Sequence, residues 1–158
     1  MRKIILALSL LAIVTTASHH SSGKQTTEQE TESNKVTVYV YKTPHQRTLG
    51  RIAPPVYCDE QLLAKLDGGR YFIVKLEPGT HSFRSKNKKD GGVEIELKVG
   101  QEYFLRMETR TGVQVNAPRI SVVPNEEGRY DVKQMKYVKD DDIKDRSKVV
   151  IPSKDGKM

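Results

Sequence analysis

The stretch YFIVKLEPGTHSFR, residues 71–84, decides the fold class. Side chains alternate between the two faces of a strand, so Phe72, Val74 and Leu76 share one face. Pro78 presets φ and Gly79 supplies a positive φ, as a type II turn requires. The pattern therefore predicts a hairpin in which residues 71–76 pair with residues 81–84.

Other stretches repeat the period of two. Residues 93–99 (VEIELKV) alternate throughout, residues 103–108 place their apolar side chains on one face, and residues 36–41 are β-branched or aromatic. Residues 120–123 form a shorter candidate strand. Turn residues separate these runs, which favours an all-β domain: an antiparallel β-sandwich or partly open barrel of about seven strands. We expect its core to contain Phe72, Val74, Leu76, Val93, Ile95, Leu97, Tyr103, Leu105 and Met107.

One segment near the C-terminal end departs from the strand pattern. Asn125 is a candidate N-cap for a helix that runs to about Met135, and Glu126 and Glu127 suit the positive end of its dipole. Gly128 lowers the helix propensity of this segment. We expect one short C-terminal helix.

The distribution of apolar residues divides the chain into four parts. Residues 1–17 resemble a signal peptide, residues 18–35 are a polar linker that we expect to be disordered, and residues 36–137 form a single β-domain. Residues 138–158 are mostly charged, and we expect a largely disordered tail.

The N-terminus predicts export. Arg2 and Lys3 precede an uncharged run from Ile4 to Val14, and residues 15–17 (TTA) are small enough for signal peptidase. The run is shorter than the ~20 residues that span a bilayer. No cysteine follows it to carry a lipid anchor. We expect a periplasmic or secreted protein that is not lipid-anchored and has no transmembrane helix after signal removal.

The densest basic stretch lies between two predicted strands and offers candidate ligand-binding residues. Removal of Arg2 and Lys3 with the signal would lower the formal net charge from +7 to +5. This modest positive balance suits an anionic envelope polymer or an envelope protein as partner, but it is also ordinary for an exported protein. Lysines also keep a soluble loop from adding to a sheet edge, so solubility is the alternative role. Export and the absence of a nucleic-acid motif argue against nucleic acid as partner. The candidate residues are Arg84, Lys86, Lys88 and Lys89.

A metal site depends on where the signal is cut. Cleavage after Ala17 would leave Ser18-His19-His20 at the N-terminus, with a free amine and an imidazole in third place. These nitrogens form the square-planar set that Cu(II) and Ni(II) prefer. An incidental polar start is the alternative. The acidic run 140–145 lacks EF-hand spacing, so we expect it to be a solvated segment.

Catalytic motifs are absent from the sequence. It contains no Gly-x-Ser-x-Gly, His-Glu-x-x-His, phosphate-binding loop or Cys-x-x-Cys, and we expect no cofactor. The single cysteine, Cys58, excludes an intrachain disulfide. A reactive cysteine needs a neighbouring base, and His81 is the only imidazole of the predicted strands that could serve. We expect a structural cysteine and a hairpin histidine.

Six strand and turn motifs follow one another along the chain: residues 38–41 (VYVY), 56–59 (VYCD), 69–72 (GRYF), 76–81 (LEPGTH), 100–106 (GQEYFLR) and 122–128 (VVPNEEG). Taken in this order, they resemble those of domain-of-unknown-function family 2846, a set of exported or lipid-anchored bacterial proteins with short β-domains. The Pro-Gly-x-His segment is also similar to PEGA surface-layer modules. Asp59-Glu60 stands where such modules carry Asp-Gly, which disfavours a tight two-residue turn. The resemblance implies a β-domain and no particular chemistry.

The residues favour a non-catalytic envelope or extracellular interaction module over an enzyme. The alternative is a hydrolase or transferase that acts on envelope carbohydrate or lipid, which would need converging carboxylates or a nucleophile with its base. Glu94 and Glu96 instead share the solvent face of one strand.

Overall fold

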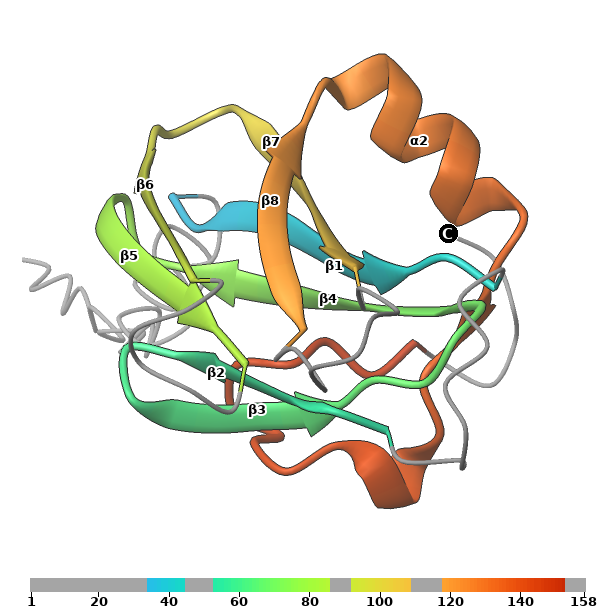
Figure 1. Cartoon of the computed structure of the whole chain (residues 1–158). Coiled ribbons are helices and arrows are strands. Elements are labelled where there is room, and N and C mark those ends of the chain that lie inside the picture. Colours follow the sequence, from blue (N-terminus) through green and yellow to red (C-terminus); the bar gives the residue numbers. More distant parts are fainter. Residues whose placement is uncertain (1–33, 45–52, 86–91, 109–117, 153–158) are drawn as a thin grey trace, which may run out of the picture.

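The computed structural model describes residues 34–44, 53–85, 92–108 and 118–152 (Figure 1). Strands dominate this part of the chain, and every strand predicted above is present. The elements are β1 (Val36–Lys42), β2 (Pro55–Cys58), β3 (Gln61–Lys65), β4 (Arg70–Leu76), β5 (Gly79–Arg84), β6 (Val93–Leu97), β7 (Glu102–Glu108), β8 (Arg119–Val123), the helix α2 (Asn125–Lys133), β9 (Lys136–Tyr137) and a 3₁₀ turn (Asp140–Asp142). No helix among the described residues has the length and apolar character that crossing a membrane requires.

These strands form two sheets. One has the order β8-β7-β1-β4-β9, and the other has the order β3-β2-β5-β6. In the first sheet β1 pairs antiparallel with β4 but parallel with β7, so the expectation of antiparallel pairing throughout is wrong. The second sheet is antiparallel. The nine described strands exceed the seven or so expected, and they do not close into a barrel.

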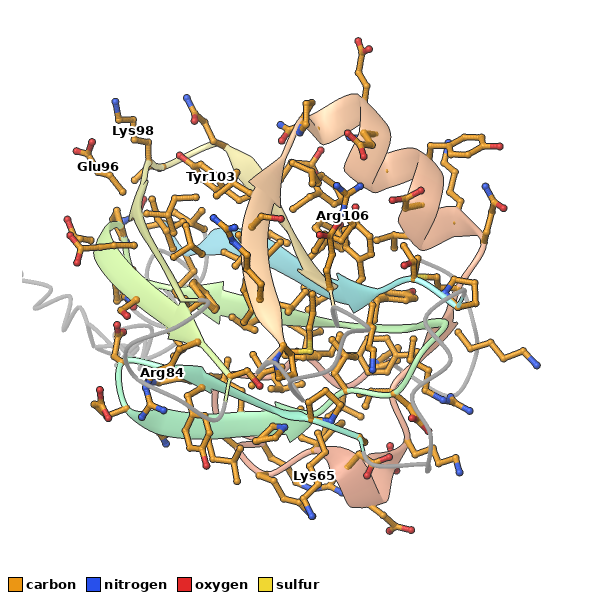
Figure 2. The ribbon with its side chains drawn as sticks, viewed as in Figure 1. Lys65, Arg84, Glu96, Lys98, Tyr103 and Arg106 are labelled. Atoms are coloured by element: carbon orange, nitrogen blue, oxygen red, sulfur yellow. The ribbon has the colours of Figure 1, made fainter. Side chains whose placement is uncertain are left out.

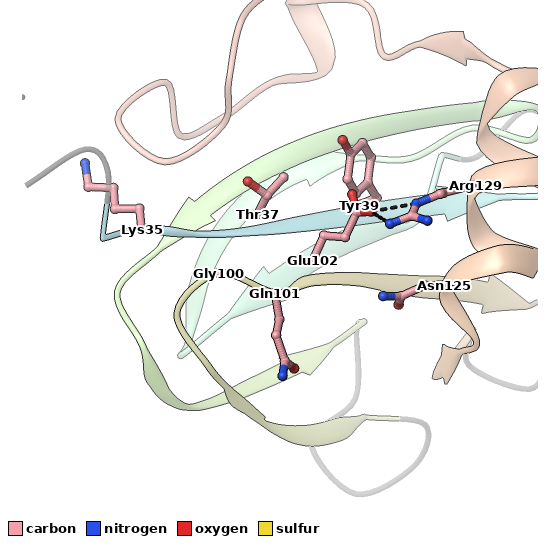
Figure 3. A pocket seen from close by; sticks show the side chains of 8 residues that line it. All are labelled: Lys35, Thr37, Tyr39, Gly100, Gln101, Glu102, Asn125 and Arg129. Atoms are coloured by element: carbon pink, nitrogen blue, oxygen red, sulfur yellow. Dashed lines mark hydrogen bonds and ion pairs between the residues drawn. The ribbon is translucent and has the colours of Figure 1, made fainter.

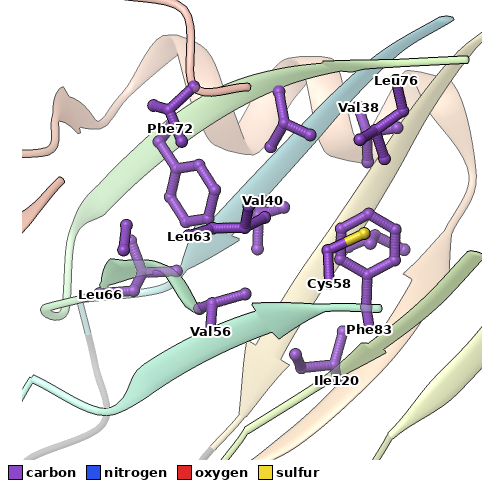
Figure 4. Packing of buried hydrophobic residues seen from close by; sticks show 14 of the residues in the cluster. Val38, Val40, Val56, Cys58, Leu63, Leu66, Phe72, Leu76, Phe83 and Ile120 are labelled. Carbon is purple, nitrogen blue, oxygen red and sulfur yellow. The ribbon is translucent and has the colours of Figure 1, made fainter. Parts of the chain in front are cut away.

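One apolar core takes side chains from both sheets (Figure 4). Val38 and Val40 of β1 meet Val56 of β2 and Phe83 of β5 within it. The predicted inward faces are confirmed. Three of the predicted core residues, Val93, Ile95 and Tyr103, are only partly buried, two of them because β6 is an edge strand. The fully confirmed positions are Phe72, Val74, Leu76, Leu97, Leu105 and Met107.

The predicted hairpin between β4 and β5 is wrong, because these strands belong to different sheets. Hydrogen bonds to β1 occupy one edge of β4, and hydrogen bonds to β9 and to residues 148–150 occupy the other. The chain therefore turns away after Leu76 and enters the second sheet, where β5 pairs with β2 and β6. The positive φ predicted at Gly79 is confirmed, at 138°. Residues 77–79 are thus a corner between sheets.

The helix α2 lies against β7 and β1, and its start differs from the prediction. Asn125 is its first residue rather than its cap, because Pro124 occupies the cap position and no side chain caps the helix. Three side chains of α2 bind the strands below. The Tyr41 hydroxyl donates to Asp131 Oδ2 at 2.9 Å, and ion pairs join Arg106 to Glu127 and Arg129 to Glu102.

Gly128 is the point at which α2 touches the sheet. It is buried, and a Cβ placed there would lie 2.3 Å from Cβ and Cγ of Phe104. The Phe104 ring is itself stacked on Tyr39, with centroids 4.6 Å apart. Glycine is accommodated here despite its low helix propensity, because a larger residue would push the helix away from β7.

Residues 138–152, expected to be part of a mostly disordered tail, are ordered and contribute to the core. Val138, Ile143 and Val149 are at most 5% exposed. The segment forms bridges from Ile143 to Ala64 of β3 and from Val149 to Val74 of β4, which belong to different sheets. Figure 1 shows this orange-to-red segment turning near β3 and running back beside β4. Ile143 stands alone among charged residues and residues 149–151 (VVI) form one short apolar run, so neither showed a period from which this could be predicted.

We predict that Gly128→Ala destabilises the fold even though alanine favours helix by ~1 kcal/mol. The added methyl group overlaps Phe104, and overpacking of this kind costs about 1–3 kcal/mol. Urea unfolding should show a lower midpoint for Gly128→Ala. The control Glu126→Ala changes an exposed residue of the same helix and should stay within about 0.5 kcal/mol of wild type. A Gly128→Ala protein as stable as wild type would mean that α2 does not rest on Phe104.

Candidate functional site

A tight turn between β2 and β3 begins the first candidate site. Cys58 pairs with Gln61, so Asp59 and Glu60 are the two residues of the loop. Both have positive φ, 47° and 70°, which is the geometry of a type I′ hairpin turn. The departure from Asp-Gly therefore does not prevent a two-residue turn, contrary to our expectation. Glutamate rarely adopts positive φ, and here its carboxylate is held by Arg84 at 2.6 Å.

The pairing of β2 with β5 brings His81 to this turn. Cys58 pairs with Phe83, and the Asp59 N–H donates to the Ser82 carbonyl at 3.0 Å. The His81 ring then lies with Nδ1 2.6 Å from Asp59 Oδ2 and Nε2 2.9 Å from the Glu77 carbonyl oxygen. Both partners are acceptors, so the ring makes both hydrogen bonds at once only when both nitrogens carry hydrogen.

Asp59 is the centre of the cluster. Its Oδ1 accepts the Ser82 backbone N–H at 2.9 Å, and its Oδ2 accepts from His81 and from the Cys58 thiol, the latter at 3.5 Å. Burial alone would raise the pKa of Asp59, but these hydrogen bonds and the neighbouring ring outweigh it and lower the pKa. Asp59 is therefore a carboxylate at neutral pH.

Cys58 lacks the setting of a nucleophile. Its side chain is fully buried, and burial together with the Asp59 carboxylate raises the pKa of its thiol to about 12. The thiol donates to Asp59 and not to His81, so the imidazole is not placed as its base. The structure brings Cys58 and His81, the two candidates from the sequence, into one cluster. They do not form a nucleophile–base pair, because each hydrogen-bonds to Asp59 Oδ2.

The predicted ligand-binding and metal residues fall mostly outside the described residues. Of the basic stretch only Arg84 is described, and Lys86, Lys88 and Lys89 are not. Arg84 lies 4.4 Å over the Tyr57 ring and pairs with Glu60, with 12% of its side chain exposed (Figure 2). It therefore belongs to the packing of β2 against β5. The N-terminal set Ser18, His19 and His20 also lies outside the described residues.

A polar groove of about 510 Å³ is the second candidate site, and sequence reasoning missed it (Figure 3). It lies between β1, the turn that joins β6 to β7, and the start of α2. Glu102 accepts from Arg129 Nε at 2.6 Å across it. A smaller hollow of about 200 Å³ shares Lys35 with the groove and is also lined by Lys75 and Lys148. The groove itself is lined by Lys35, Thr37, Tyr39, Gly100, Gln101, Glu102, Asn125 and Arg129.

Comparison with known families shows the family to which the chain belongs. The model of the family described as "Protein of unknown function (DUF2846)" matches residues 32–119, more than half of the sequence. The chain belongs to the DUF2846 family. The DUF2846 match begins just before β1 and ends at the first residue of β8, so it contains the Cys58–Asp59–His81 cluster. It does not contain α2 or Lys148, which help to line the groove and the hollow.

A relative from Haemophilus influenzae extends further along the chain. It is described as an uncharacterized protein and is 23% identical over 128 residues, which cover 80% of this chain and 74% of the relative. This similarity therefore reaches beyond the DUF2846 region.

The lowered pKa of Asp59 predicts a defined acid dependence of stability. A carboxyl with a lowered folded-state pKa stabilises the fold above its unfolded pKa of ~3.9, and this contribution is lost as pH falls through the folded value. Asp59→Asn keeps a residue that tolerates positive φ but removes the charge, and it should cost about 1 kcal/mol at pH 7. Denaturant unfolding at pH 7 and pH 3 should show the difference from wild type shrinking in acid. Glu94→Gln, on an exposed edge, is the control. A difference for Asp59→Asn that is the same at both pH values would contradict the proposed role of the carboxylate.

Proposed function

We propose that this DUF2846 protein is a non-catalytic, exported interaction module that binds an anionic polymer of the bacterial envelope. The observation that carries the proposal is the pair of adjoining hollows that share Lys35. Among the described residues that line them, the two hollows bring together the cations Lys35, Lys75, Arg129 and Lys148 and one carboxylate, Glu102, which pairs with Arg129. A polymer strand with repeated negative charges could contact cations in both hollows at once.

The remaining lining residues suit a polar, extended partner. Gln101 and Asn125 provide amide groups that can donate and accept, and the Tyr39 ring is fixed by its stack on Phe104. Polar side chains on a preformed wall fix the orientation of a ligand. The signal-like N-terminus supports export. Export would bring the protein to the envelope, where a partner of this kind is found.

The chemistry of Cys58 favours binding over catalysis. The Cys58 thiol is fully buried and donates to Asp59, and burial together with that carboxylate raises its pKa, which disfavours the thiolate that a nucleophile requires. Cys58 and His81, the residues considered as a nucleophile and its base, therefore give no support to the hydrolase or transferase alternative.

Cosedimentation with isolated envelope material tests the proposal. The double variant Arg129→Gln/Lys148→Gln removes one cation from each hollow and should weaken binding at least tenfold. The control Lys65→Gln/Lys133→Gln removes the same charge from exposed positions on β3 and α2 and should bind as wild type does (Figure 2 shows Lys65). Binding should also weaken with salt, because exposed charges are screened over ~10 Å at 0.1 M.

The predicted basic loop supplies a further arm of the same experiment. If Lys86→Gln/Lys88→Gln/Lys89→Gln abolishes binding and Arg129→Gln/Lys148→Gln does not, the loop and not the groove is the binding surface. Equal losses for the groove variant and its control would mean that only net charge matters. Either result would overturn the assignment of the groove.

A further inference from the structure

The turn between β2 and β3 gathers three side chains of different chemistry at one point. Cys58 Sγ, a carboxylate oxygen of Asp59 and a ring nitrogen of His81 all lie within 4.8 Å of one another. They come from the end of β2, from the turn and from β5. None of them lines the polar groove, so the cluster is independent of the proposed polymer-binding surface.

We propose that Cys58, Asp59 and His81 form a binding site for a divalent transition metal ion, with Zn²⁺ as the best match. Sulfur, imidazole nitrogen and carboxylate oxygen are the three ligand types that proteins use for zinc. Thiolate and imidazole together disfavour the hard ions Mg²⁺ and Ca²⁺, which prefer oxygen ligands alone.

The donor atoms lie close enough to reach the spacing of a tetrahedral ion by movement of the side chains, since all three are within 4.8 Å of one another. With bonds of about 2.0–2.3 Å, neighbouring ligand atoms of a zinc site lie roughly 3.5 Å apart. Cys58 Sγ and Asp59 Oδ2 are already separated by 3.5 Å. His81 Nδ1 and Asp59 Oδ2 are 2.6 Å apart and would separate by roughly 1 Å as the ion replaces their hydrogen bond. The Asp59 side chain is 41% exposed, so it has room to make this movement.

The surroundings of His81 match those of a ligating histidine. Histidines that bind metals usually donate their second ring N–H to a backbone carbonyl or a carboxylate, which fixes the ring and directs the other nitrogen at the ion. His81 Nε2 lies 2.9 Å from the Glu77 carbonyl oxygen, which leaves Nδ1 directed at Asp59. Glu77 belongs to the corner that carries the chain between the sheets, so the ring is held by the fold itself.

Binding would release protons and leave one position open. The Cys58 thiol would lose its proton to solvent and His81 Nδ1 would bind as a free nitrogen, while Asp59 is already a carboxylate. With three protein ligands, the fourth position of the ion would face the solvent beside Asp59, where water or a group from a partner could bind.

Cobalt(II) titration of the reduced protein tests the site directly, because cobalt–thiolate bonds give a near-ultraviolet charge-transfer band. Cys58 is the only cysteine of the chain, so any such band comes from this cluster. The nitrogen-only set predicted at Ser18-His19-His20 cannot produce it. We expect one saturable band of 1:1 stoichiometry that Zn²⁺ displaces and Cys58→Ser abolishes.

Two further variants keep the test independent of the buried cysteine. His81→Gln and Asp59→Asn should each weaken cobalt affinity at least tenfold while the near-ultraviolet circular dichroism of the fold is retained. Glu60→Gln, the neighbouring carboxylate in the same turn, should bind cobalt as wild type does. No thiolate band, or a band unchanged by His81→Gln and Asp59→Asn, would overturn the proposal.

Discussion

The fold depends on the backbone hydrogen bonds through which the C-terminal segment joins the two sheets. Lys144 N–H donates to the Leu63 carbonyl of β3 at 2.8 Å, and Val150 N–H donates to the Ile73 carbonyl of β4 at 2.9 Å. Ile143 and Val149 enter the core beside these contacts. Without this segment, the edges of β3 and β4 would present unpaired backbone groups, and apolar side chains between the sheets would be exposed to water.

The passage of the chain from one sheet to the other also creates the Cys58–Asp59–His81 cluster. Because hydrogen bonds occupy both edges of β4, the chain turns at residues 77–79 and runs on as β5 beside β2. That register sets His81 next to Asp59, and the corner supplies the Glu77 carbonyl that holds the second ring nitrogen. The groove has a different origin, since α2 approaches β7 closely only because Gly128 lies over Phe104.

The period of two and the turn residues predicted β1 and β4 to β8, because these signals are local, whereas β3 and β9 were not predicted. Phe72, Val74 and Leu76 were assigned correctly for that reason. Pairing depends on contacts between distant residues, so nothing local indicated that β1 runs parallel to β7. The turn at Gly79 had a local signal, but nothing local indicated that it joins two sheets rather than two strands of a hairpin. The core positions of Ile143 and Val149 were missed because Ile143 stands alone among charged residues and Val149 belongs to a single run of three apolar residues with no period. Cys58 and His81 were both considered, but the central role of Asp59 follows only from the β2–β5 register.

Amide hydrogen exchange under native conditions tests most directly whether residues 138–152 close the core. The amides of Lys75, Lys144 and Val150 carry the hydrogen bonds between this segment and the two sheets. The account predicts that they exchange only through global unfolding, with the same free energy of opening as the amide of Val38 in the central strand β1. Exchange of Lys144 and Val150 at the rate of an unstructured chain, while Val38 stays protected, would contradict it.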